Sequence, residues 1–355
     1  MEPRFSHIAC AIATLVLLAG AAVPAVAQRV EGRVVSASDS AGIASALVQL
    51  LDGAGARVAQ VSTAADGTFR LSAPTPGRYV VAVLRIGQRA WRSAAMDIET
   101  GVRRSLTIAL PDDPILLAQI SVEARTACRT SPAEGSLIAD LLQEVDRALS
   151  LTRMAMERRE FQYLVERYER TATPAFQTVD SSATVDLGGG WPIRSASPES
   201  LAVHGFVRQE DAVAGQLLGR YIYYGPDAPV LLSPWFLSTH CFGVSEGSGA
   251  DSGTVVVSFR PEHARRADIA GRLVLAGRTL ELRRVEWRYV GLPYWVNREG
   301  AGGAMTLDRL PSAVYLPTQW WTCAPVPQVS QLPGRGGRVT LWGWKEGGGR
   351  IVPSP

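Results

Sequence analysis

The chain has 355 residues and a formal net charge of +3, from 36 basic and 33 acidic residues. Nearly all of the basic residues are arginine, with Lys345 as the only lysine, and no run of five like charges occurs. This composition argues against nucleic acid or an anionic lipid surface as a partner, and the length allows two domains.

The start of the chain has the three zones of a secretory leader. Arg4 supplies a positive end, residues 8–22 are almost wholly apolar, and Ala25-Val26-Ala27 is a small-residue cleavage site before Gln28. The apolar run is shorter than the roughly 20 residues of a membrane-spanning helix. We therefore predict that residues 1–27 are a cleaved signal peptide and that the mature chain is periplasmic or secreted, without a transmembrane anchor.

Three cysteines remain in the mature chain, and an oxidising compartment favours the pairing of two of them. Cys128 lies in a polar stretch that gains from being tied down, and Cys241 follows an apolar turn. We therefore favour a Cys128–Cys241 disulfide, although three cysteines allow three pairings. Cys323 is then predicted to be a buried thiol in a strand. No Cys-x-x-Cys spacing occurs, so neither a zinc site nor a redox pair is expected.

Residues 28–124 have the pattern of a small all-β domain. Short alternating segments recur every 8–12 residues, with turn signals such as Asp52-Gly53 and Asp66-Gly67 between them. This pattern predicts a β-sandwich. We interpret Phe69 and Tyr79 as core aromatics rather than as a ligand platform, because buried aromatics dominate the cores of small sandwiches.

The same segment resembles the carboxypeptidase regulatory-like domain, a transthyretin-like β-sandwich with a carbohydrate-binding-like fold. The matching pieces are Val30-x-Gly32-x-Val34, Ala46-x-Val48-x-Leu50, Thr63-x-x-Asp66-Gly67-x-Phe69-x-Leu71 and Pro76-Gly77-x-Tyr79-x-Val81. The pattern departs from the family at Gly87-Gln88, where an aromatic commonly follows the glycine. The resemblance implies an accessory domain and not a peptidase. There is no histidine between residues 28 and 203, which a carboxypeptidase zinc site would need.

A polar linker at residues 125–135 precedes a predicted helix. Apolar residues from Leu137 to Leu149 recur at helical spacing on one face, and Ser136 is a candidate cap. We interpret this helix as a cover for the sheet of a second domain, because an apolar stripe normally faces the protein's own core. A partner-docking helix is the alternative.

Residues 136–355 are predicted to form an antiparallel β domain that begins with this helix. Its strands are expected within residues 161–170, 177–187, 220–224, 254–259, 270–276, 279–290, 303–307, 313–322 and 338–344, and a strand ending at residues 230–232 should lead into a short helix. In the segment 280–289, alternation places Leu280, Leu282, Arg284, Glu286 and Arg288 on one side, and Arg283, Val285, Trp287 and Tyr289 on the other.

This second half weakly resembles the lipoprotein-carrier (Lol-like) half-barrels, in which a curved antiparallel sheet lies over a helix. The resemblance rests on the amphipathic helix and on the hairpin at residues 271–289, and it implies a concave face that could hold an acyl chain. The candidates to line such a groove are Trp235, Trp287, Tyr289, Trp320 and Trp321. The alternative is an ordinary core, which we favour because a deep lipid groove would expose a large apolar surface.

The catalytic candidates are few. His204, His240 and His263 are the histidines of the mature chain. The pair His240-Cys241 suggests a thiol enzyme, but neighbours on a strand point to opposite faces and an oxidised Cys241 is inert. Neither a Gly-x-Ser-x-Gly elbow nor a phosphate loop occurs. We therefore predict no catalytic, metal-binding or cofactor-binding residues.

The sequence thus predicts a mostly β chain, with an N-terminal transthyretin-like sandwich and a C-terminal curved antiparallel sheet under one covering helix. The favoured hypothesis is an exported, non-catalytic binding or scaffold protein of the cell envelope. Its partner would be an envelope protein, a glycan or a lipid, and not nucleic acid. The alternatives are a periplasmic lipid or lipoprotein carrier and an envelope hydrolase, which would need His204, His240 and an acid within about 3 Å of one another.

Overall fold

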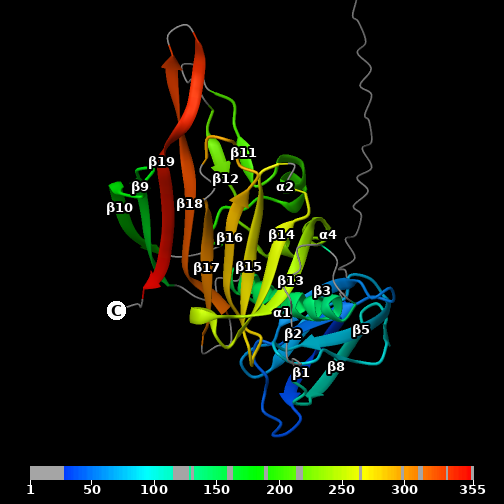
Figure 1. Cartoon of the computed structure of the whole chain (residues 1–355). Coiled ribbons are helices and arrows are strands. Elements are labelled where there is room, and N and C mark those ends of the chain that lie inside the picture. Colours follow the sequence, from blue (N-terminus) through cyan, green and yellow to red (C-terminus); the bar gives the residue numbers. More distant parts are fainter. Residues whose placement is uncertain are drawn as a thin grey trace, which may run out of the picture.

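The computed structural model of the chain is shown in Figure 1. It describes residues 28–114, 128, 132–157, 163–187, 191–212, 219–263, 266–296, 300–310, 315–332 and 335–352. The described part is mostly strand, with an N-terminal pair of sheets and one large C-terminal antiparallel sheet, so the predicted fold class is confirmed. The predicted leader at 1–27 lies outside the described residues, and so does most of the predicted linker.

The N-terminal sandwich consists of two facing sheets. One sheet has the strand order β4-β1-β8, and the other has the order β3-β2-β5-β6, with β7 also paired to β5. The strands are β1 (Arg29–Ser36), β2 (Leu47–Leu51), β3 (Arg57–Ser62), β4 (Thr68–Ser72), β5 (Gly77–Leu84), β6 (Trp91–Arg92), β7 (Met96–Ile98) and β8 (Arg103–Leu110). Strand β1 pairs antiparallel with β4 and parallel with β8, and its apolar residues enter the core between the sheets.

The turn from β3 to β4 explains the Asp-Gly-x-Phe motif. The Asp66 carboxylate accepts hydrogen bonds from the backbone N–H of Thr68 at 3.0 Å and from its hydroxyl at 2.8 Å. Gly67 has a φ of +85°, and a Cβ at this position would lie 2.2 Å from the Val34 carbonyl oxygen. Only glycine fits both requirements. Phe69 then lies buried in the sandwich core.

The Pro-Gly-x-Tyr motif has a related role at the start of β5. The Tyr79 ring is buried in the same core, and its hydroxyl donates a hydrogen bond to the Thr75 carbonyl oxygen at 2.7 Å. The phenol therefore satisfies its polar end while its ring contributes apolar packing, as buried tyrosines usually do.

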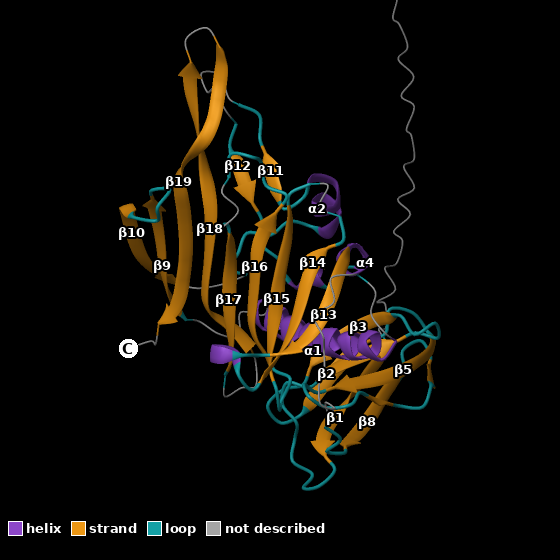
Figure 2. Ribbon diagram, in the orientation of Figure 1, coloured by secondary structure: helices purple, strands orange, loops and turns teal. Residues whose placement is uncertain are grey.

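The C-terminal half is built on a nine-stranded antiparallel sheet with the order β10-β9-β19-β18-β17-β16-β15-β14-β13 (Figure 2). The strands are β9 (Leu164–Ala172), β10 (Thr178–Leu187), β13 (His240–Glu246), β14 (Thr254–Pro261), β15 (Asp268–Ala276), β16 (Leu282–Val290), β17 (Gly302–Arg309), β18 (Tyr315–Leu332) and β19 (Arg335–Val352). The hairpin of β18 and β19 extends well beyond the rest of the sheet (Figure 1).

One face of this sheet is covered by helix α1 (Pro132–Glu157). Leu141, Val145 and Leu149 of α1 are fully buried and belong to one core cluster with apolar side chains of the strands, including Leu282 and Val285. We call this side of the sheet the covered face. The prediction of a helix over the second sheet is in agreement with this packing.

Helix α1 also packs against the N-terminal sandwich. Leu151 and Met154 pack against Leu47 of β2 and against Ile86 in the loop after β5. The nearby carboxylate of Glu144, which is fully buried, accepts a hydrogen bond from the backbone N–H of Gly87 at 2.8 Å.

The cation that partners Glu144 is on the same helix. Arg147 pairs with Glu144 and donates to the carbonyl oxygens of Arg85 and Gln88, at 3.3 and 3.0 Å. The Gly87-Gln88 segment, where the sequence departs from the family pattern, is therefore the docking point of the sandwich on α1.

Three features of the second half differ from the sequence prediction. Residues 228–231 form the short helix α3 (Ala228–Leu231) instead of the end of a strand, because Asp227 caps it by accepting from the Val230 N–H. Helix α4 (Pro234–Thr239) follows, as expected for the short helix. The second difference is that helix α2 (Pro198–His204) and a separate two-stranded sheet of β11 (Val207–Gln209) and β12 (Tyr221–Tyr223) are present beside the large sheet.

The third difference is a bulge at Arg283. Val274 pairs with Arg284, but Leu275 pairs with Leu282, so the register shifts between these pairs. An extra residue in one strand reverses the alternation beyond it. Leu282 is consequently buried in the core together with Val285, and it does not share the side of Glu286 as predicted.

Candidate functional site

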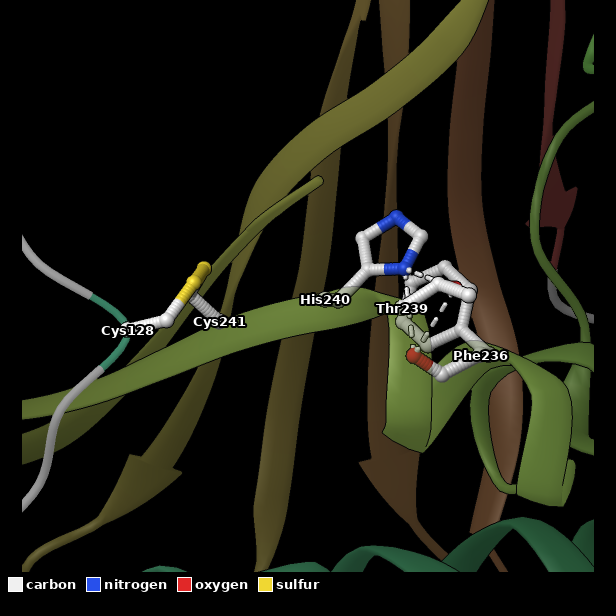
Figure 3. Close-up of a disulfide and its surroundings, with 5 residues drawn as sticks. All are labelled: Cys128, Phe236, Thr239, His240 and Cys241. Atoms are coloured by element: carbon white, nitrogen blue, oxygen red, sulfur yellow. Dashed lines mark hydrogen bonds between the residues drawn. A yellow bond between two sulfur atoms is a disulfide. The ribbon is translucent and has the colours of Figure 1, made fainter. Parts of the chain in front are cut away.

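His240 is the histidine with the most neighbours that could suggest chemistry. Its Nδ1 lies 3.2 Å from the Thr239 hydroxyl oxygen and 3.1 Å from the Phe236 carbonyl oxygen, and its Nε2 lies 3.2 Å from the Asp268 carboxylate without hydrogen-bond geometry. Figure 3 shows the imidazole beside the Phe236 ring, with a centroid distance of 3.7 Å.

This arrangement lacks an accessible reacting group. The His240 side chain is buried, and the Thr239 hydroxyl is hydrogen-bonded to the Trp235 carbonyl oxygen at 2.8 Å. His204 and His263 are exposed, and within the described residues neither is a hydrogen-bond or ring partner of His240. The hydrolase constellation of His204, His240 and an acid is therefore not brought together; His240 closes the end of helix α4.

A disulfide joins Cys128 to Cys241, which is the pairing that the sequence analysis favoured (Figure 3). It links the segment ahead of α1 to β13, the strand at one edge of the large sheet. Cys323 is a free, buried thiol on β18, and burial raises the pKa of this thiol to about 11, with the nearby Glu346 carboxylate as a smaller cause. Neither position therefore offers a reactive thiolate.

The open face of the large sheet, opposite α1, holds a pocket of about 770 Å³. Side chains alternate between the two faces along a strand. On β16 the covered face therefore has Val285, Trp287 and Tyr289, and the open face has Arg284, Glu286 and Arg288. The pocket volume is within the range of about 300–1,000 Å³ that is typical of ligand sites.

The floor of the pocket consists of small or apolar residues, and its sides are polar. Val256 and Ala270 are only 7 % and 4 % exposed although they lie on the open face, which is expected for the bottom of a hollow. The charged side chains come from three adjacent strands: Arg260 from β14, Arg272 from β15, and Arg284, Glu286 and Arg288 from β16.

Four of the charged groups at the pocket form a closed set of ion pairs. Arg272 and Arg284 each contact both Asp251 and Glu286, with distances to the Asp251 carboxylate of 3.2 and 2.6 Å. Asp251 lies in the turn between β13 and β14 and is nearly buried. This quartet is electrically balanced, with two cations and two anions.

Arg260 and Arg288 also line the pocket, outside this quartet. Arg288 is exposed and makes no ion pair with a carboxylate in the described ranges. The residues across from it are small, since Arg288 pairs with Ala270 on one side and with Gly302 on the other.

The predicted groove aromatics are divided between the two faces. Trp321 lines the pocket and is 38 % exposed, opposite Ala304 in the pairing of β17 and β18. Trp287 also borders the pocket but is buried, and Tyr289 and Trp320 are buried in the core of the covered face. Trp235 is partly buried and packs with Phe206 at the start of α4.

Sequence reasoning missed the arginine cluster. The doublet Arg283-Arg284 is visible in the sequence, but it gives no sign of the cluster. The positions of Arg260, Arg272 and Arg288 depend on the register of three strands, which sequence spacing does not reveal.

Within the described residues, no group of three or more potential metal ligands occurs, and no helix is long and apolar enough to cross a membrane.

Comparison with known proteins identifies the N-terminal sandwich. Residues 29–111 match the family model of the carboxypeptidase regulatory-like domain, so this resemblance is confirmed for that part of the chain. No curated protein matches the chain significantly. The family defines the sandwich as a known type of module and assigns no ligand to the open-face pocket in the other half.

Solved structures give only distant similarities. They include the minor pilin GBS52 of Streptococcus agalactiae, with 15 % identity over 27 % of this chain and a TM-score of 0.19. The chain spans about half of that pilin, with 48 % covered. A DUF3823 family protein from Bacteroides uniformis has 12 % identity over 74 % of this chain and 96 % of its own, with a TM-score of 0.20. A 9R-lipoxygenase from Cyanothece has 9 % identity over 78 % and 41 %, with a TM-score of 0.19. Similarities this low carry no argument about function.

Proposed function

We propose that this chain is an exported, non-catalytic binding protein of the cell envelope, and that its ligand binds in the open-face pocket. The observation that carries the proposal is the pocket itself. It gathers arginines and an exposed tryptophan, Trp321, on the face of the sheet that the core does not use. Exposed aromatic and arginine side chains in a hollow are the usual anchors of recognition sites.

Export is supported by two features that are independent of the pocket. The first 27 residues have the composition of a cleaved leader. The Cys128–Cys241 disulfide fits an oxidising compartment, because cytosolic thiols are kept reduced.

The lack of catalysis is supported by the groups that line the pocket. Among its described residues, Ser258 and Thr306 carry hydroxyls, but no histidine lines the pocket to act as their base. The Glu286 carboxylate is held by Arg272 and Arg284 and is therefore a poor candidate for a general base.

The lipid-carrier hypothesis has less support. An acyl chain would need an apolar groove, but the covered face of the sheet is filled by the protein's own core. Its aromatic side chains Trp287, Tyr289 and Trp320 are at most 5 % exposed. The open face, in contrast, presents charged and polar groups, which would be costly to cover with a hydrocarbon chain.

The test uses the full chain expressed with its own leader. We expect the mature protein in the periplasmic or secreted fraction, with Gln28 as its first residue by N-terminal sequencing. In calorimetric titrations with envelope-derived oligosaccharides, peptides and phospholipid vesicles, one class should bind saturably without being converted.

Two tryptophan variants locate the binding site. Trp321→Ala should weaken saturable binding, and Trp342→Ala, which removes an exposed tryptophan outside the pocket, should leave it unchanged. Retention of the uncleaved chain in the cytoplasm, or binding that is indifferent to Trp321, would contradict the proposal.

A further inference from the structure

We infer that strand β10 is a self-association edge, at which a second copy of this chain adds its own β10 antiparallel, about a two-fold axis through Thr184. The inference goes beyond the proposed function, because β10 lies at one margin of the large sheet and contributes no residue to the open-face pocket (Figure 1). The occupant of this edge is the chain itself, and not the ligand of the pocket.

Strand β10 is a long edge strand that the rest of the molecule leaves uncovered. It pairs with β9 on one side, and the described residues place no strand on its other side. All ten of its residues are exposed, whereas β13, at the opposite edge of the same sheet, has three buried residues. The outer side of β10 therefore presents a row of backbone N–H and C=O groups, which is a template for another strand.

The regular part of β10 lacks the usual protection of an edge strand. Natural edges are blocked by lysine, by proline or by a bulge. Residues 180–187 contain neither lysine nor proline, and the register irregularity lies ahead of them, between Thr178 and Asp180. Of the two charged residues in this part, Asp186 is paired with Arg167 on the neighbouring strand at 3.3 Å. Nothing in residues 181–187 thus prevents the approach of a further strand.

The side chains of this part form one apolar and one polar stripe. Paired residues on neighbouring strands share a face, and the pairings across β9 and β19 place Ala183 in one row with Trp321, on the open face. The open-face stripe consists of Ser181, Ala183, Val185 and Leu187, and the opposite stripe consists of Asp180, Ser182, Thr184 and Asp186. Val185 and Leu187 are 61 % and 73 % exposed, so the apolar stripe has no cover within the chain.

Symmetry limits the ways in which two copies of β10 can pair. A two-fold axis perpendicular to the sheet keeps each face on its own side, so the residue at the axis pairs with its own counterpart. An axis at Ala183 would set Asp180 opposite Asp186 of the second copy, which is an unfavourable like-charge contact, and symmetry would repeat it. An axis at Ser182 would join only residues 180–184 of the regular part, because the bulge follows. An axis at Thr184 joins residues 181–187.

The register about Thr184 matches the strand to itself. On the open face, Val185 lies opposite Ala183 of the second copy, so two apolar side chains meet. On the other face, the Asp186 carboxylate lies opposite Ser182, whose hydroxyl can donate to it, and Thr184 meets its counterpart. Pairs of these kinds stabilise antiparallel strands. The edge is therefore self-complementary, which selects a second copy as its occupant, and the small interface predicts a reversible dimer.

The first test is sedimentation velocity of the full mature chain over a range of concentrations. We expect a reversible monomer–dimer equilibrium, and Val185→Lys should raise the dimer dissociation constant at least about tenfold, because a lysine blocks an edge. Val203→Lys on α2 makes the same change at another exposed position, and its dissociation constant should stay within about twofold of wild type. A wild-type chain that stays monomeric up to about 0.1 mM would overturn the inference, as would a dimer that Val185→Lys does not weaken.

The second test reads the register by oxidative crosslinking of single-cysteine variants. Thr184→Cys should give a disulfide-linked dimer on a non-reducing gel, because residues directly opposite on antiparallel strands have Cα atoms about 4.5–5.5 Å apart, within the range of a disulfide. Ser182→Cys and Ala183→Cys are the matched controls, whose counterparts would be more than about 7 Å away in this register. The native Cys323 is buried and should not contribute.

The crosslink should also depend on the apolar stripe. Adding Val185→Lys to the Thr184→Cys variant should remove most of the disulfide-linked dimer. Linkage at Ser182→Cys or Ala183→Cys without linkage at Thr184→Cys would overturn the register about Thr184. Equal linkage at all three positions would indicate random collision and would overturn the paired edge itself.

Discussion

The two faces of the large sheet are made by the same strands and have opposite characters. Along β16, Val285, Trp287 and Tyr289 are buried in the core of the covered face, and the residues between them carry charged side chains that line the pocket. The period of two in a strand thus lets one segment supply a core and a recognition surface at once. A substitution on β16 should therefore alter either stability or binding, depending on whether its side chain belongs to the covered face or to the open face.

The largest expected effect is on the covered face. Trp287→Ala should lower the free energy of unfolding by about 3–5 kcal/mol, because it empties a large buried volume. Trp321→Ala, the same change on the open face, should cost less than about 1 kcal/mol. Urea denaturation measures both values. Similar losses for the two variants would break the division between the faces.

The next test concerns the disulfide. Cys241 belongs to the open side of β13, so its bond to Cys128 should stabilise the folded chain without adding to the core. Replacing Cys128 and Cys241 with serine should cost about 2–5 kcal/mol, since the link closes a loop of 113 residues. Guanidinium denaturation of the double variant checks this value. An unchanged unfolding midpoint would mean that the disulfide does not contribute to the stability of the sheet edge at β13.

A smaller, pH-dependent effect on the free energy of unfolding is expected where α1 packs against the sandwich. Burial raises the pKa of Glu144 above its ordinary 4.5, against the opposing influence of Arg147. The stability that Glu144 contributes should therefore be complete below pH 4.5, where both the folded and the unfolded chain hold its proton, and should decline as pH rises through the raised folded-state value.

The reference for this effect is Glu144→Gln, which does not titrate. The unfolding free energy of the wild type minus that of the variant should fall as pH rises from about 4 towards neutrality. A difference that rises over the same interval would mean that pairing with Arg147 outweighs burial.

The smallest effect is expected at Cys323. Its thiol is 3 % exposed and its pKa is raised to about 11, so almost no thiolate is present at pH 8. Iodoacetamide should leave the native mature chain unmodified and should label Cys323 once the chain is unfolded in urea, as mass spectrometry would reveal. Rapid labelling of the native chain would place the thiol at the surface.

Local patterns in the sequence were sufficient to predict the sandwich, the covering helix and most strands of the large sheet. The turn at Asp66-Gly67 and the apolar stripe of α1 are determined by residues close together in the chain, so their signals are readable. The bulge at Arg283 could not be predicted, because alternation alone gives no sign of an inserted residue. This bulge places Leu282 on the opposite face from the one predicted.

The pocket was harder to predict than the fold. Trp321 was named as a groove residue, but it was grouped with four aromatics that the structure distributes elsewhere. The arginines of the pocket come from strands whose mutual register is set by tertiary pairing. Surface chemistry assembled across strands has no local signature, in contrast to a helix stripe or a turn.

The contact at Gly87 has a consequence for domain exchange. The backbone of Gly87 and Gln88 is bound by Glu144 and Arg147. A Cβ at Gly87 would also lie 2.6 Å from the Thr279 carbonyl oxygen. A sandwich grafted from another protein would lose this fit unless the loop came with it, so the two halves of this chain are matched parts and not interchangeable ones.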